Sequence, residues 1–309
     1  MSKKSLVFFA MFLSGLVVLS SGCGPETQSA NLSLEFDESV STYKYTSEYI
    51  QDYKFEQPRL EKVKEEQNKT VVSMVYDREI LSVEEDSSAN AKIIIKELSV
   101  LMTGRDELDF DSTNENAKNQ PLYDLIGKSY TIEIYPDGTV KTLNASGAQR
   151  AVSGGMSAKI ARNLMSPEQI EKRHSVSLPE EQAAKIAKGE SYSKVVPSPP
   201  KTLEPKAFEK IYTLDRIEDG IAVIEMSALP SDQPVEGMDE QAGLGFMAKM
   251  FDTQETYEGR MKFDIKKSQV LSLNEKFKAT YFATDPNKDP EKSDKLKMGL
   301  TFNVSLEKL

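Results

Sequence analysis

Apolar residues recur at every second position in many segments of this 309-residue chain, and this alternation limits its fold more than any other feature. The clearest series lies near the C-terminal end: Leu296, Met298, Leu300, Phe302, Val304 and Leu306. Successive side chains of a β-strand point to opposite faces, so such a segment has one buried face and one solvated face. The sequence therefore predicts strands that each contribute one face to a core.

Turn residues between the alternating segments predict hairpins. Pro136-Asp137-Gly138 separates Tyr130-Ile132-Ile134 from Val140, and Glu218-Asp219-Gly220 separates two further segments. Glycine accepts the positive φ that tight turns require. We expect about eleven strands, several of them longer than is typical, joined as an antiparallel meander.

The middle of the chain carries helix signals. Ser157–Met165 has helical spacing of apolar residues, and Ser166-Pro167-Glu168-Gln169 is a capping box with Pro at the first helical position. Ser177-Leu178-Pro179-Glu180 repeats this pattern and predicts a further helix that continues to Lys188. Four prolines then predict a stiff connector: Pro197, Pro199, Pro200 and Pro205.

These signals predict a mainly β (α+β) fold, a large curved antiparallel sheet or half-barrel with a few helices covering one face. Its parts are a first β-rich part (32–145), a helical segment (146–192), a Pro-rich connector (193–205) and a second β-rich part (206–309). We expect residues 32–309 to form one folded unit, as one sheet or two fused sheets. Both β-rich parts share a meander pattern, and a duplication stays an open alternative.

Composition excludes several classes of function. A net charge of −10 without a Lys/Arg block argues against a nucleic-acid partner. One Cys, one His and no Trp leave too few residues for a zinc site or a nucleophile–His couple, so we expect no cofactor and no enzymatic activity. We interpret His174 as a surface cation near a helix end. A hydrolase that uses carboxylates alone stays a weaker alternative.

Two acidic loops have part of a calcium-binding pattern. They begin at Asp109 and Asp285, but Asn114 and Pro290 stand where an EF-hand loop needs Gly. The final carboxylate is missing from both. We interpret them as solvated loops and predict no metal site.

The first 22 residues have the features of an export signal. Lys3 and Lys4 precede an apolar run over residues 6–19, which is too short for a comfortable membrane span. Gly22-Cys23 follows and resembles the lipobox of bacterial lipoproteins, with Ser20 where that motif usually has Leu. The resemblance implies cleavage after residue 22 and acylation of Cys23. An ordinary secretory signal, with Cys23 left as a free thiol, is the alternative.

A lipid on Cys23 implies a protein that is exported and anchored to a membrane rather than spanning it. Residues 23–31 are small and polar, and we expect them to form a flexible lipidated tether. No Asp follows Cys23, and by resemblance to well-studied lipoproteins this favours the periplasmic side of the outer membrane over the inner membrane. The rest of the chain has no cysteine and therefore no disulfide.

The order of these motifs resembles an uncharacterised family of bacterial exported lipoproteins. The resemblance rests on the lipobox, Phe110-Asp111-Ser112, Ile126-Gly127-Lys128-Ser129, Tyr135 to Val140 and the hairpin that starts at Gly259. That family carries no assigned activity. More distantly, the expected architecture is similar to the half-barrel of periplasmic lipoprotein carriers, which hold acyl chains between sheet and helices.

A segment rich in Met and Gly, residues 237–251, is the candidate functional element. Its large apolar residues are Met238, Leu244, Phe246, Met247, Met250 and Phe251. Flexible Met side chains beside glycines suit a mobile cover over an apolar cavity. The alternative is a short helix that fills the concave face as ordinary core.

The leading hypothesis is a non-enzymatic module that binds an apolar or lipid-like ligand between sheet and helices. The rival is an envelope structural or interaction protein whose concave face is filled by its own side chains. A cavity of roughly several hundred Å³ favours binding, and a closed core favours the rival. Protein partners are not predicted.

Overall fold

A computed structural model of the chain describes residues 28–180, 183–199, 202–203, 206–233, 235, 251–284, 289 and 292–309. It confirms the mainly β class: the described residues form a twelve-stranded antiparallel sheet, a separate pair of strands and three α-helices. The large sheet contains β2 (Val40–Gln57), β3 (Lys62–Val83), β4 (Ala89–Thr103), β5 (Leu108–Asp111), β6 (Ser129–Ile134), β7 (Val140–Asn144), β9 (Ser191–Pro197), β10 (Ala207–Glu218), β11 (Ile221–Ser231), β12 (Asp252–Asp264), β13 (Gln269–Thr284) and β14 (Lys295–Lys308). The pair is β1 (Ser29–Asn31) with β8 (Lys185–Ala187).

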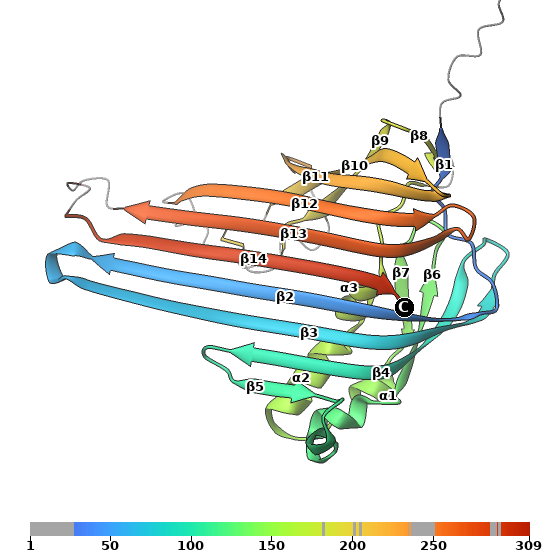
Figure 1. Ribbon diagram of the computed structural model, residues 1–309. Coiled ribbons are helices and arrows are strands. Elements are labelled where there is room, and N and C mark those ends of the chain that lie inside the picture. The colour runs from blue at the N-terminus through green and yellow to red at the C-terminus, as the bar shows by residue number, and fades with distance from the viewer. Residues whose placement is uncertain are drawn as a thin grey trace, which may run out of the picture.

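The helices lie on one face of the sheet. They are α1 (Ser146–Gln149), α2 (Gly155–Leu164) and α3 (Pro167–His174), with 3₁₀ turns at Pro58–Leu60, Glu115–Asn119 and Pro121–Leu125. Figure 1 shows β2–β4 and β12–β14 as one long curved layer, with the helices behind it and the far ends of the longest strands extending beyond them. A large antiparallel sheet with a few helices on one face is thus the arrangement that the sequence predicts.

The strand order joins the two halves of the chain at the centre of the sheet. Along the sheet it runs β7-β6-β4-β3-β2-β14-β13-β12-β11-β10-β9, with β5 paired to β4 outside this path. Strand β2 pairs with β14 from Tyr43 opposite Lys308 to Glu56 opposite Lys295. Strands of both predicted β-rich parts therefore belong to one sheet rather than to two.

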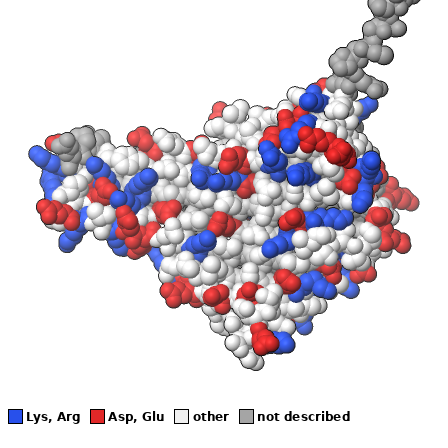
Figure 2. Space-filling view, viewed as in Figure 1, with Lys and Arg blue, Asp and Glu red and all other residues white. Residues whose placement is uncertain are grey.

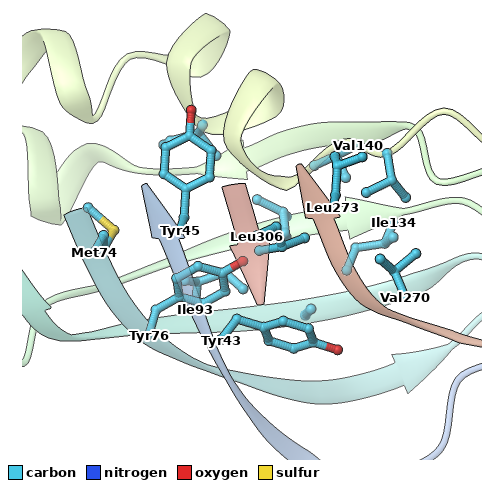
Figure 3. Packing of buried hydrophobic residues seen from close by; sticks show 14 of the residues in the cluster. Tyr43, Tyr45, Met74, Tyr76, Ile93, Ile134, Val140, Val270, Leu273 and Leu306 are labelled. Atoms are coloured by element: carbon cyan, nitrogen blue, oxygen red, sulfur yellow. The ribbon is translucent and has the colours of Figure 1, made fainter. Parts of the chain in front are cut away.

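A row of buried side chains crosses the helix-facing side of the sheet. Its members are register partners on eight neighbouring strands: Leu98, Met74, Tyr45, Leu306, Leu273, Met261, Ile224 and Leu214. Figure 3 shows Tyr45 and Leu306 pointing from the sheet toward the helices. Period-two alternation in each strand places one member of this row on the same face, and their common burial makes the row the centre of the core.

The predicted hairpins are confirmed. Strands β6 and β7 flank a turn in which Gly138 has φ of 80°, and β10 and β11 flank a turn in which Asp219 and Gly220 have φ of 53° and 83°. Two consecutive positive φ values match the right-handed twist of a hairpin.

The helix predicted from Ser177 is wrong. The chain from Ser175 to Glu180 has no regular structure, and Lys185–Ala187 is strand β8. The N–H groups of Val176 and Leu178 donate to the carbonyls of Gly138 and Asp137 at 2.9 and 3.0 Å. These tertiary hydrogen bonds, together with full burial of Leu178, outweigh the local capping signal.

The same segment lies between the two ends of the sheet, which do not pair with each other. It bonds to the β6–β7 turn on one side, and the Ser177 carbonyl accepts a hydrogen bond from the Tyr192 hydroxyl of β9 on the other, at 2.9 Å. Lys194 of β9 also lies 3.4 Å from the Asp137 carboxylate. The sheet is therefore strongly curved but is not closed into a barrel.

Two segment boundaries also differ from the prediction. Residues 191–197, placed in the helical segment and the connector, form β9, an edge strand, which is the place in a sheet where Pro197 is tolerated. Ser29–Asn31, expected to belong to the tether, pair with β8, and Ala30 is buried. The folded part thus begins before residue 32.

The face of the sheet that points away from the helices is polar. Figure 2 shows Lys/Arg and Asp/Glu side chains intermixed over the visible face, without a large area of one sign. Within the described ranges, no helix has the length and apolar character needed to cross a bilayer.

Candidate functional site

A cavity of about 400 Å³ lies between the helix-facing side of the sheet, α3 and the end of β9. Its apolar lining is Tyr45, Val176, Val196, Pro197, Pro199, Phe208, Ala228, Tyr257, Leu273, Phe277, Phe302, Val304 and Leu306. Its polar lining is Glu168, Lys172, Arg173, Ser175, Ser177, Ser198, Lys210 and Glu275. The space is thus apolar over most of the sheet and polar beside α3.

The floor of the cavity consists of successive cross-strand rows. Beside the core row, Val304 pairs with Glu275, and beyond them Tyr257, Phe277 and Phe302 form an aromatic row across β12, β13 and β14. Phe208 of β10 meets Phe277 edge to face, with ring centroids 5.7 Å apart. Because register partners in antiparallel strands face the same side, the alternation in three strands, together with their register, assembles this surface.

An ion pair crosses the floor. The Lys210 ammonium lies 2.6 Å from the Glu275 carboxylate, and both side chains are about four-fifths buried. The same ammonium lies 4.8 Å from the ring centroid of Tyr257, within the range of a cation–π contact. Burial raises the pKa of Tyr257, and the neighbouring Glu275 carboxylate raises it further, so the phenol stays protonated.

The roof over this floor is α3, which starts at the predicted capping box. The Ser166 side chain accepts a hydrogen bond from the Gln169 N–H, as the sequence predicts. The Glu171 carboxylate accepts the Thr142 N–H at 2.9 Å, which fixes the helix against β7. The next two residues of the same helix, Lys172 and Arg173, both line the cavity.

Lys172 and Arg173 differ in their surroundings. Lys172 is exposed, and its ammonium lies 4.9 Å from the ring centroid of Phe302. Desolvation by the neighbouring protein lowers the pKa of this ammonium, and the Glu168 carboxylate partly offsets that effect. Arg173 is only 4% exposed and donates to the Tyr130 hydroxyl at 3.3 Å and to the Leu164 carbonyl at 2.8 Å.

His174 is buried, so its interpretation as a surface cation is wrong. Its Nε2 lies 2.7 Å from the Tyr130 hydroxyl, and its ring meets Tyr76 edge to face at 4.7 Å. Burial lowers its pKa well below the usual value, and the charges of Arg173 and Arg78 lower it further. The last turn of α3 faces the core because the helix packs on the sheet. The polar sequence of α3 does not indicate this burial.

Phe251 is the single member of the predicted cover inside the described residues. It is partly buried and packs against a second apolar cluster that includes Phe208 and Phe277, next to the cavity floor. Met238, Leu244, Phe246, Met247 and Met250 lie outside the described residues, as does Cys23. The assignment of residues 237–251 as a cover therefore stays a prediction.

Sequence reasoning missed the residues that line the cavity. Phe277 and Phe302 were expected only as strand residues and Lys172 and Arg173 only as helix residues, and Phe208 was not singled out. The alternation, together with the strand register, was the signal that could have found them. The strands present a larger apolar surface than three short helices can cover.

The acidic loop at Asp109 has a structural explanation. Phe110 is buried in β5, and the Asp111 carboxylate accepts hydrogen bonds from the Thr113 N–H and hydroxyl at 2.9 and 2.7 Å. These bonds lower the pKa of Asp111. Over the described ranges, no group of three or more His, Cys, Asp or Glu side chains has the geometry to hold a metal ion. Residues 285–288 of the second loop lie outside the described residues.

Comparisons with known proteins give no family. No family model and no curated protein matches the chain. Among solved structures, an acetoacetate decarboxylase-like enzyme from Sphingomonas wittichii RW1 aligns over 89% of this chain and 94% of its own, with 8% identity and a TM-score of 0.10. A TM-score this low carries no argument about fold or activity.

Proposed function

We propose that this protein is an exported lipoprotein, anchored to a membrane through Cys23, that binds an apolar or lipid-like ligand between its sheet and α3 without catalysing a reaction. The periplasmic side of the outer membrane is the proposed location. The cavity beneath α3 is the observation on which the binding function rests. The lipobox-like Gly22-Cys23 supports the anchor.

The size and lining of the cavity fit such a ligand. Its volume of about 400 Å³ falls in the range of small-molecule sites, about 300–1,000 Å³. Transfer of an acyl chain from water to the aromatic row of Tyr257, Phe277 and Phe302 contributes about 0.8 kcal/mol for each CH₂ group that is buried. Several methylene groups would therefore give measurable affinity without any covalent chemistry.

The rival function, a scaffold whose concave face is filled by its own side chains, predicts a closed core at this position. An open space between sheet and helix favours binding over that alternative. Glu275 is held in an ion pair with Lys210, so this cavity carboxylate does not favour a carboxylate-dependent hydrolase.

Mass spectrometry of the native protein, purified under conditions that keep non-covalent complexes, tests the binding function. We expect an additional mass that organic extraction removes and that added lipid restores. Ala228→Phe, which fills the cavity from β11, should lower uptake at least about tenfold. Ser227→Phe on the exposed opposite face is the matched control. Absence of any co-purified or added lipid would contradict the binding function.

The anchor has a separate test. Mass spectrometry of the N-terminal peptide from the membrane fraction should show Cys23 as the first residue, with acyl chains attached. Cys23→Ala should prevent acylation. An unmodified Cys23 thiol in the membrane fraction would contradict the lipoprotein assignment.

A further inference from the structure

The cavity lining carries more positive than negative charges, although the net charge of the whole chain is −10. Three cations and two carboxylates line it: Lys172, Arg173, Lys210, Glu168 and Glu275. Lys210 and Glu275 neutralise each other at 2.6 Å. The remaining three charges all belong to α3, so the roof carries the cationic excess.

Arg173 is a buried cation that has no anionic partner in the part of the chain that the structure describes. Among the described residues, no carboxylate lies within 4.0 Å of its guanidinium, and its Nε–H is buried without a hydrogen-bond acceptor. Its other two nitrogens donate to neutral oxygens, the Tyr130 hydroxyl and the Leu164 carbonyl. A buried charge of this kind is costly unless an anion accompanies it.

Lys172 supplies a second cation beside Arg173 in the same lining. No described carboxylate lies within 4.0 Å of its ammonium either, and its closest recorded contact is the face of the Phe302 ring. Phe302 belongs to the aromatic row on the floor. A cationic roof therefore faces the apolar surface on which a chain of methylene groups would lie.

We propose that the ligand is an acyl-chain amphiphile with an anionic oxygen head group, a carboxylate or a phosphate, that binds at Lys172 and Arg173. Its chain lies along Tyr257, Phe277 and Phe302. This inference rests on the proposed function, because it names the class of ligand for the same cavity. Charge-assisted hydrogen bonds to Arg and Lys are the ordinary means of holding such head groups.

Four probes of equal chain length separate the head group from the chain: dodecanoate, dodecyl phosphate, dodecanol and dodecylamine. Their affinities are measured by displacement of a neutral fluorescent dye from the full chain carrying Cys23→Ala. We expect both anions to bind at least about tenfold more tightly than dodecanol, and dodecylamine to bind most weakly. The tighter anion identifies a fatty acid or a phospholipid as the source of the head group.

Lys172→Met should reduce the affinity for both anions about tenfold and leave that for dodecanol unchanged, because it removes a charge but keeps an apolar side chain. The control is Lys276→Met, since Lys276 follows Glu275 in β13 and therefore faces the opposite side. If the Arg173→Gln variant folds, it should have the same effect as Lys172→Met. If it does not fold, Lys172→Met alone tests the head-group assignment.

The outcomes separate the two proposals. Equal affinities for dodecanoate and dodecanol, or an equal loss of anion affinity in Lys276→Met, would overturn the head-group assignment while the apolar site stands. Failure of all four probes to bind would overturn the binding function itself.

Discussion

The Tyr130 hydroxyl lies 2.7 Å from Nε2 of His174, and both side chains are buried. Nη1 of Arg173 donates to the same hydroxyl at 3.3 Å, and a guanidinium has only donors. The lowered pKa of His174 keeps its imidazole neutral. In the tautomer that carries its proton on Nδ1, Nε2 accepts the Tyr130 proton, and hydrogen bonds then run from Arg173 through Tyr130 to His174.

This network makes stability depend on pH. The imidazole titrates near pH 6.5 in the unfolded chain, whereas its pKa in the folded protein is well below that value. Below about pH 6.5 the unfolded state therefore binds more protons, and the free energy of unfolding falls by up to about 1.4 kcal/mol per pH unit. The contribution is fully present above this pH.

His174→Gln isolates the effect, since the amide can still form a hydrogen bond with the Tyr130 hydroxyl but does not titrate. Urea unfolding of both proteins between about pH 7.5 and about pH 5.5 should show a constant difference above pH 6.5 and a relative loss for the wild type below it. Parallel curves over the whole range would contradict a buried neutral His174.

Gly138→Ala should destabilise the protein more than Gly127→Ala. Both glycines have a positive φ, 80° and 77°, so both variants pay for a left-handed conformation. A Cβ at Gly138 would also lie 2.3 Å from the Val176 carbonyl oxygen, whereas one at Gly127 meets nothing within 4 Å. We expect a further loss of about 1–3 kcal/mol for Gly138→Ala in urea unfolding. Equal losses would show that the segment around Val176 can move away from the new methyl group without a loss of stability.

The Lys210–Glu275 pair should couple more strongly than an exposed pair. A double-mutant cycle with Lys210→Met and Glu275→Gln is expected to give about 1–3 kcal/mol, because the pair is about four-fifths buried. The matched cycle at Arg260 and Glu225, which are 53% and 40% exposed, should give less than about 1 kcal/mol. Similar coupling at both sites would mean that water screens the cavity as well as the surface.

Core and edge positions should differ sharply in their tolerance of truncation. Ile132→Ala removes a fully buried side chain and should lower the free energy of unfolding by about 2–5 kcal/mol. Val63→Ala, at a residue 61% exposed in β3, should cost less than about 1 kcal/mol. A large loss at Val63 would reveal a contact outside the described residues.

The strands were predictable because their cause is local. Period-two alternation and positive-φ turns located β6–β7, β10–β11 and β14 without any knowledge of their neighbours. The helix expected at Ser177 failed because Leu178 is buried and its N–H is bonded to Asp137, a contact between distant parts of the chain. Capping signals indicate the local preference of a segment. Here tertiary hydrogen bonds outweigh that preference and hold the segment in a non-helical conformation.

The site was less predictable than the fold. Alternation indicated that Phe277 and Phe302 face a core, but the register that places them side by side depends on the β13–β14 pairing. The burial of Arg173 and His174 was hidden because α3 is mostly polar, and only its position over the sheet brings those two residues inside. The sequence alone does not show how much of the twelve-stranded sheet the three short helices cover. The cavity therefore could not be predicted from it.

The pairing of β2 with β14 means that the centre of the sheet is completed only when β14 has been made. Among the described strands, β2 is made early and β14 after the others, so until β14 is in place, one edge of β2 and one edge of β13 both lack a partner. Unpaired edges of such length invite association with other chains. Deleting β14 would therefore divide the sheet at its centre rather than shorten it at one side, and would leave two edge-exposed halves prone to aggregation.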